Sequence, residues 1–137
     1  MKLIYGLLLS TSVMFAGDNS SLIKEYIDFM NKTPEPGREI KQEGQNVLYI
    51  QTDDGQLQNF FGKPIKEKGK EILKMSSDIE FCDTMEAKIL LREGIIFKVK
   101  LLDKEGNTYL NTETRKEDCK DIRKKEEQVS NYLLRNR

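Results

Sequence analysis

The sequence predicts an α+β domain, in which two β-hairpins form an antiparallel sheet of about four strands with helices packed on one face, followed by a charged C-terminal helix. Two patterns support this fold class. Residues 95–102 (IIFKVKLL) alternate apolar and charged side chains, which is typical of a strand with one buried face. Residues 22–30 and 79–90 instead repeat apolar side chains at the spacing of a helical face. The length of 137 residues fits a single domain.

Residues 1–16 have the order of a secretory signal peptide. Lys2 supplies a positive charge, residues 4–15 form a short apolar run, and Ala16 is a small residue at a cleavage point. About a dozen apolar residues are fewer than the roughly 20 that span a bilayer. We therefore predict a cleaved leader. Two alternatives stay open, namely an uncleaved membrane anchor and a first helix of the domain.

The first part of the remaining chain predicts one helix and one hairpin. An amphipathic helix over residues 22–30 ends at the proline-containing link 33–37 (TPEPG). Residues 38–42 and 47–52 are the two strands of the hairpin, and residues 43–46 (EGQN) form its turn.

The central part predicts two helices after an ambiguous segment. Residues 56–61 (QLQNFF) allow either a strand that returns along the sheet or a loop that carries Phe60 and Phe61 into the core. Pro64 suits the first turn of a helix. Residues 76–78 (SSD) predict a break and the start of a second helix. The apolar face of that second helix contains Ile79, Cys82, Met85, Ile89 and Leu90.

The last part predicts a second hairpin and a helical tail. Residues 95–102 and 108–114 are the strands, joined by a glycine-containing turn at 103–107. We place the domain over residues 17–119 and a separate charged helix over 120–137. The thin apolar stripe of this helix suits docking on its own domain and binding of a partner equally well.

Cys82 and Cys119 are the two cysteines of the chain. An even number of cysteines in an exported protein predicts a disulfide bond. The two residues lie 37 positions apart, and closing a loop of that length stabilises a fold by roughly 3.8 kcal/mol in the chain-entropy description.

The composition argues against several functional classes. The chain has 23 basic and 23 acidic residues, so its net charge gives no indication of nucleic-acid binding. It contains no histidine, which excludes histidine-based catalytic triads and the common catalytic zinc sites. No nucleophile elbow, phosphate-binding glycine loop or metalloprotease motif is present. We therefore expect a protein that is not an enzyme and needs no cofactor or metal.

Two groups of residues are candidates for contact with a partner. Phe60 and Phe61 lie between turn residues, and Tyr132 lies on the C-terminal helix, so these rings could anchor another protein or fill the core. Lys98 and Lys100 share the outer face of one strand, where they could form a positive stripe with Lys116 or simply solvate the sheet.

The second half of the chain resembles an uncharacterised family of small exported bacterial proteins. The shared pattern is a helical cysteine, an apolar segment ending in glycine, an aromatic strand, an acidic-glycine turn and a closing acidic-cysteine pair. Its positions here are Cys82, 89–94 (ILLREG), 96–99 (IFKV), 103–106 (DKEG) and 118–119 (DC). The resemblance implies a compact periplasmic α+β domain with one disulfide and implies no reaction.

These observations favour a periplasmic or secreted protein that binds another envelope or secreted protein, as an accessory factor, an inhibitor or an immunity protein. They indicate a membrane contact only through the N-terminal segment. Two other hypotheses stay open: a small hydrolase of envelope polymers that uses two carboxylates, and a membrane-tethered protein that keeps its leader.

Overall fold

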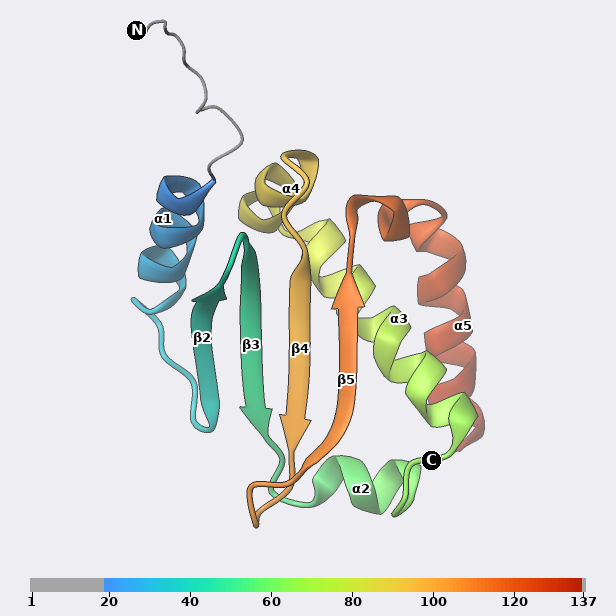
Figure 1. Cartoon of the computed structure of the whole chain (residues 1–137). Helices are drawn as coiled ribbons and strands as arrows, with labels where there is room; N and C mark the ends of the chain where they lie inside the picture. The colour runs from blue at the N-terminus through green and yellow to red at the C-terminus, as the bar shows by residue number, and fades with distance from the viewer. Residues whose placement is uncertain (1–18, 137) are drawn as a thin grey trace, which may run out of the picture.

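The computed structural model describes residues 19–136, and the predicted leader over residues 1–16 lies outside this range. The described chain forms a four-stranded sheet with helices behind and around it (Figure 1). The elements in order are α1 (Ser20–Met30), β2 (Arg38–Glu43), β3 (Asn46–Thr52), α2 (Gln56–Phe61), α3 (Glu67–Asp83), α4 (Met85–Arg92), β4 (Phe97–Leu102), β5 (Thr108–Thr114), the 3₁₀ turn η1 (Lys116–Cys119) and α5 (Ile122–Arg135). The α+β class is confirmed.

The two predicted hairpins are present, and they meet side by side in the order β2-β3-β4-β5. Strand β2 pairs antiparallel with β3, and β4 pairs antiparallel with β5. The central strands β3 and β4 are parallel, with Tyr49 opposite Val99. The sheet is therefore mixed rather than wholly antiparallel. The helical connection through α2, α3 and α4 returns the chain to the end of the sheet where β3 began, which is the geometry of a parallel crossover.

The helices cover one face of the sheet, as predicted. The Tyr26 ring of α1 meets the Phe97 ring of β4 edge-on, with centroids 5.3 Å apart. The Phe81 ring of α3 meets Tyr49 of β3 in the same way at 5.0 Å. Phe97 has no exposed surface, and the Tyr26 and Tyr49 hydroxyls share a buried hydrogen bond. Aromatic rings from two helices and two strands thus form the centre of the main core.

Residues 56–61 form a helix, so neither structure predicted for them is correct. The buried Asp53 carboxylate accepts hydrogen bonds from the backbone N–H groups of Leu57 and Gln58 at 3.2 and 3.3 Å. Gly55 precedes the helix with φ of 107°, a left-handed value that suits glycine. Asp53 and Gly55 therefore start a helix where the apolar pattern alone was ambiguous.

The predicted break at Ser76–Asp78 is also incorrect, because α3 continues through these residues to Asp83. The Ser76 hydroxyl bonds back to the Ile72 carbonyl at 2.9 Å, an arrangement that a helix interior permits. The break comes at Thr84 instead, whose backbone is extended with ψ of 125°.

Asp78 is 1% exposed, and its carboxylate has three polar contacts, one each from β5, α3 and α5. Its carboxylate accepts hydrogen bonds from the Thr114 hydroxyl of β5 at 2.6 Å, Lys74 of α3 at 2.8 Å and Lys125 of α5 at 2.9 Å. Lys125 also donates to the Asp118 carbonyl at 2.6 Å. A buried carboxylate needs such partners, so Asp78 fixes β5, η1 and α5 against α3.

Helix α5 docks on its own domain. Its Val129 and Tyr132 pack against the second core cluster, which consists of Phe61, Ile65 and Ile72. This answers the question that the thin apolar stripe left open, although Leu134 at the end of the helix is 60% exposed.

The predicted disulfide joins Cys82 of α3 to Cys119 of η1, with Cα atoms 5.4 Å apart. We expect the variant Cys82→Ala/Cys119→Ala to lose about 4 kcal/mol of unfolding free energy, because the unfolded chain gains the entropy of an open loop. Urea unfolding of the variant, and of the wild type with and without reductant, measures this loss. Equal stability in all three samples would contradict the prediction.

Asp78→Asn should lower the unfolding free energy by about 3 kcal/mol, because the neutral amide leaves Lys125 without a counter-charge and leaves Lys74 with Asp118 alone. Asp83→Asn is the matched control, since Asp83 is an exposed aspartate at the end of the same helix. Urea unfolding of both variants at neutral pH makes the comparison. If the two variants are equally stable, the Asp78 cluster does not hold the C-terminal segment.

Candidate functional site

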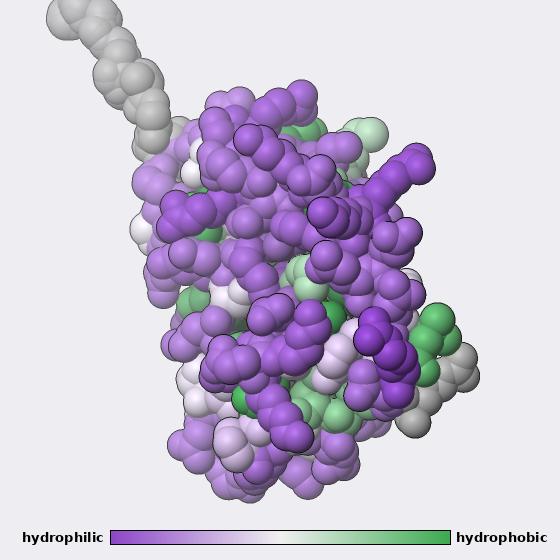
Figure 2. Space-filling view, turned by 90° about the vertical axis from the view of Figure 1, so that its right-hand side faces the viewer, coloured by the Kyte–Doolittle hydropathy of each residue, from purple (hydrophilic) through white to green (hydrophobic). Residues whose placement is uncertain are grey.

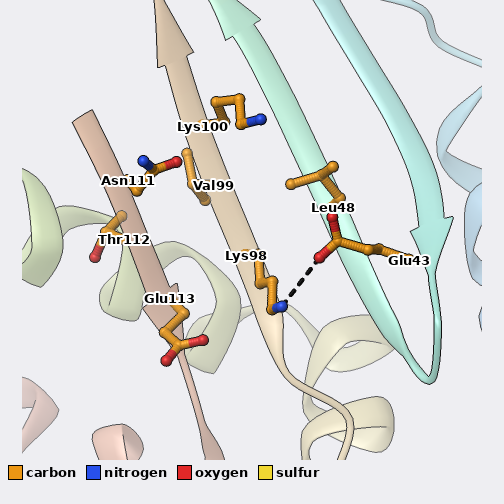
Figure 3. Close-up of a pocket in the computed structure, with 8 residues that line it drawn as sticks. All are labelled: Glu43, Leu48, Lys98, Val99, Lys100, Asn111, Thr112 and Glu113. Carbon is orange, nitrogen blue, oxygen red and sulfur yellow. Dashed lines mark hydrogen bonds and ion pairs between the residues drawn. The ribbon is translucent and has the colours of Figure 1, made fainter. Parts of the chain in front are cut away.

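Lys98 and Lys100 lie on the open face of the sheet, as predicted (Figure 3). Lys98 of β4 reaches across Leu48 and binds Glu43 of β2, with its Nζ 3.0 Å from Oε1. The hydrogen bond and charge of Lys98 lower the pKa of Glu43. The shallow hollow here, about 380 Å³, contains acidic and basic side chains together, including Glu113. This face therefore carries compensated charge.

Phe60, Phe61 and Tyr132 come together in one aromatic cluster between α2 and α5. The Phe61 and Tyr132 rings stack with centroids 5.9 Å apart, and Phe60 meets Phe61 edge-on at 4.8 Å. Phe61 is 8% exposed and belongs to the second core cluster, whereas Phe60 is 41% exposed. Of the two adjacent rings, only Phe60 presents a surface to a partner.

Helix α4 presents an apolar ridge to solvent that the sequence did not predict. Met85 is 72% exposed and Ile89 is 39% exposed, although both were expected on a buried helical face. The break at Thr84 changes the direction of the helix, so that Ala87, Leu90 and Leu91 are buried instead. Residues 89–91 are three consecutive apolar residues, and a helix in contact with a core on one side cannot bury all three. That run was the available indication.

A hollow lies on each side of the α4 ridge. The first, about 510 Å³, lies between α4 and η1 and is lined by Met85, Lys88, Ile89, Leu91, Arg92, Lys116 and Cys119. The second, about 260 Å³, lies between α1 and α4 and is lined by Leu22, Glu25, Tyr26, Phe29, Glu86, Ile89 and Leu90. Ile89 borders both hollows, and Phe29 is 45% exposed beside the second. We call the ridge and the two hollows the α4 surface.

A narrower cleft of about 230 Å³ lies between α3 and the sheet, with Glu35, Arg38 and Glu80 among its lining residues. Desolvation raises the pKa of Glu80, and the Glu35 carboxylate adds to the rise. The Glu35 side chain is 65% exposed and paired with Arg38 at 2.9 Å. Glu35 and Glu80 are therefore both exposed acids, and Glu35 is held in an ion pair.

Within residues 19–136, no group of three histidine, cysteine, aspartate or glutamate side chains could hold a metal ion. In the same range, none of the helices combines the length and the hydropathy needed to cross a bilayer. The α4 surface combines three exposed large apolar side chains, Phe29, Met85 and Ile89, with two adjoining hollows.

Helix α5 forms another face of the domain. Figure 2 shows that face, which is mainly hydrophilic, with apolar residues that gather in the lower half of the view. Leu133 and Leu134 of α5 are 43% and 60% exposed. They follow Tyr132, whose ring lies 6.4 Å from that of the exposed Phe60, so this face also carries some apolar surface.

The fold is similar to that of three solved bacterial proteins. Two are type II secretion system pilotins. EpsS from Vibrio vulnificus is 12% identical, with a TM-score of 0.54 and coverage of 75% of this chain and 96% of that chain. AspS from Vibrio cholerae is 14% identical, with a TM-score of 0.54 and coverage of 79% of this chain and 100% of that chain. A Pseudomonas aeruginosa protein described as secreted has 11% identity, a TM-score of 0.59 and coverage of 81% and 100%. No protein-family profile and no curated protein sequence matches the chain. At these identities, the likeness shows a shared fold.

Phe61→Ala should cost about 3–4 kcal/mol of unfolding free energy, because it opens a cavity in the second core cluster. Phe60→Ala should cost less than about 1 kcal/mol, because that ring is largely at the surface. The two neighbouring substitutions remove the same atoms, so the difference between their unfolding free energies in urea reflects the different burial of the two rings. A larger loss for Phe60→Ala would reverse the assignment of the two rings.

Proposed function

We propose that this protein is an exported, non-enzymatic accessory protein of the bacterial envelope that binds another envelope protein through the α4 surface. The apolar ridge on α4 carries the proposal. Met85, Ile89 and Phe29 are large apolar side chains that a folded domain normally buries, and they border two hollows rather than standing alone. Their burial by a partner would contribute about 25 cal/mol for each Å² removed from water.

Two further observations support an envelope role. The leader predicted over residues 1–16 and the disulfide between Cys82 and Cys119 both suit an oxidising compartment outside the cytosol. The fold is shared with two secretion-system pilotins and with a protein described as secreted. Among the accessory, inhibitor and immunity roles, this likeness favours the accessory role.

The α4 surface is preferred to the other candidate surfaces because its exposed apolar side chains border two hollows. Lys98 is already paired with Glu43, and Phe61 already fills a core. Phe60 and Tyr132 form an aromatic contact at the other end of the domain, beside α2. These residues therefore serve as comparison sites for the test.

A photo-crosslinking amino acid introduced at position 85 or 89 should trap one protein in the envelope of the bacterium that makes this chain. Positions 60 and 100, on the aromatic cluster and the open sheet face, are the matched comparisons. The result expected is the same adduct from positions 85 and 89 and none from the other two. An adduct from position 60 or 100 alone would show that the partner binds there and not at the α4 surface. The absence of any adduct would refute the proposed function.

A further inference from the structure

The charges on α4 are arranged in two separate edges along its apolar ridge. Lys88 and Arg92 are four residues apart and therefore lie on the same side of the helix. Met85 and Ile89 form the next row, and Glu86 lies on the opposite edge. A partner lying on the ridge would meet positive charge on one side and negative charge on the other.

The positive edge is reinforced by η1 across the first hollow. Lys116 lines that hollow together with Lys88 and Arg92, so three cations surround its apolar floor. Over residues 19–136, the side chains of these three residues have no ion pair and no hydrogen bond, in contrast with Lys98, which binds Glu43 at 3.0 Å. The hollow therefore carries an uncompensated positive charge beside apolar surface.

The negative edge belongs to the second hollow. Glu25 of α1 and Glu86 of α4 line it beside Phe29 and Ile89. Neither carboxylate has an ion-pair partner in the described part of the chain. A uniformly anionic surface such as a phospholipid membrane would be attracted to one edge and repelled by the other. A protein segment can instead match both edges.

We propose that the partner of the α4 surface is a protein segment with apolar anchors and an acidic edge, bound so that its carboxylates face Lys88, Arg92 and Lys116. This inference rests on the proposed function and adds the chemistry and orientation of the partner. Apolar contact at Met85 and Ile89 excludes water next to the charged groups, which strengthens the attraction between opposite charges. Charge complementarity of this kind fixes which partner binds and in which direction.

Selection of random 16-residue displayed peptides on the exported protein, purified from the periplasm, tests the proposal. The peptides recovered should contain apolar residues with neighbouring Asp or Glu. Their affinity should fall at least about tenfold on Lys88→Glu/Arg92→Glu/Lys116→Glu. The matched control, Lys63→Glu/Lys66→Glu/Lys104→Glu, makes the same change in net charge at exposed positions outside the two hollows and should leave the affinity within about twofold.

Ile89→Asp should abolish binding of the selected peptides, because it removes the shared apolar contact of the two hollows. Peptides without an acidic bias, peptides insensitive to Ile89→Asp, or equal losses in the two triple variants would overturn the proposal. A dimer of the protein that Ile89→Asp dissociates would assign the surface to a second copy, and binding to phosphatidylglycerol vesicles that depends on Ile89 would assign it to a membrane. Either result would overturn it too.

The crosslinking experiment separates the failure of this inference from the failure of the proposed function. A protein trapped from positions 85 and 89, together with peptides that lack an acidic bias, would leave the proposed function in place and overturn only the charge assignment. The absence of an adduct from these positions would refute both.

Discussion

Two contacts one helical turn apart on α3 hold the C-terminal part of the chain in place. Asp78 binds Thr114 and Lys125, and Cys82 is bonded to Cys119 four residues further along the helix. They act together with the packing of Val129 and Tyr132 of α5 on the second core cluster. The position of η1, and with it the first hollow of the α4 surface, follows from the same pair.

The two contacts stabilise the fold in different ways. The disulfide acts mainly by restricting the unfolded chain, so its effect does not require additional buried surface. The Asp78 cluster removes a carboxylate from water, and its ion pairs and hydrogen bonds must first offset that desolvation before they stabilise anything. The disulfide is therefore the larger net contribution, whereas Asp78 selects one arrangement of β5, η1 and α5. A domain with two separate core clusters benefits from both.

Local sequence patterns were sufficient to predict an element where residues close in the sequence determine its structure. The first helix, both hairpins and the disulfide follow from spacing, turn residues and cysteine number. The patterns failed where a distant contact decided the outcome. Asp78 looks like a helix-starting residue until Lys125, 47 positions away, is placed beside it. The parallel pairing of β3 with β4 likewise depends on the path of three helices. The sequence pattern identified Met85 and Ile89 of the α4 surface as residues of one apolar helical face, but it predicted that this face is buried.

The error at Met85 and Ile89 explains why an interaction surface is difficult to find in a single sequence. An apolar residue at helical spacing predicts burial. That prediction does not tell whether the residue is buried within its own chain or against a partner. The distinction appears only when the core is complete without that residue. Here Ala87, Leu90 and Leu91 already fill the contact between α4 and the core, with at most 3% of each exposed, so Met85 and Ile89 are surplus to the fold. Surplus apolar side chains between two oppositely charged edges are costly for a domain on its own, which is why we assign them to a partner.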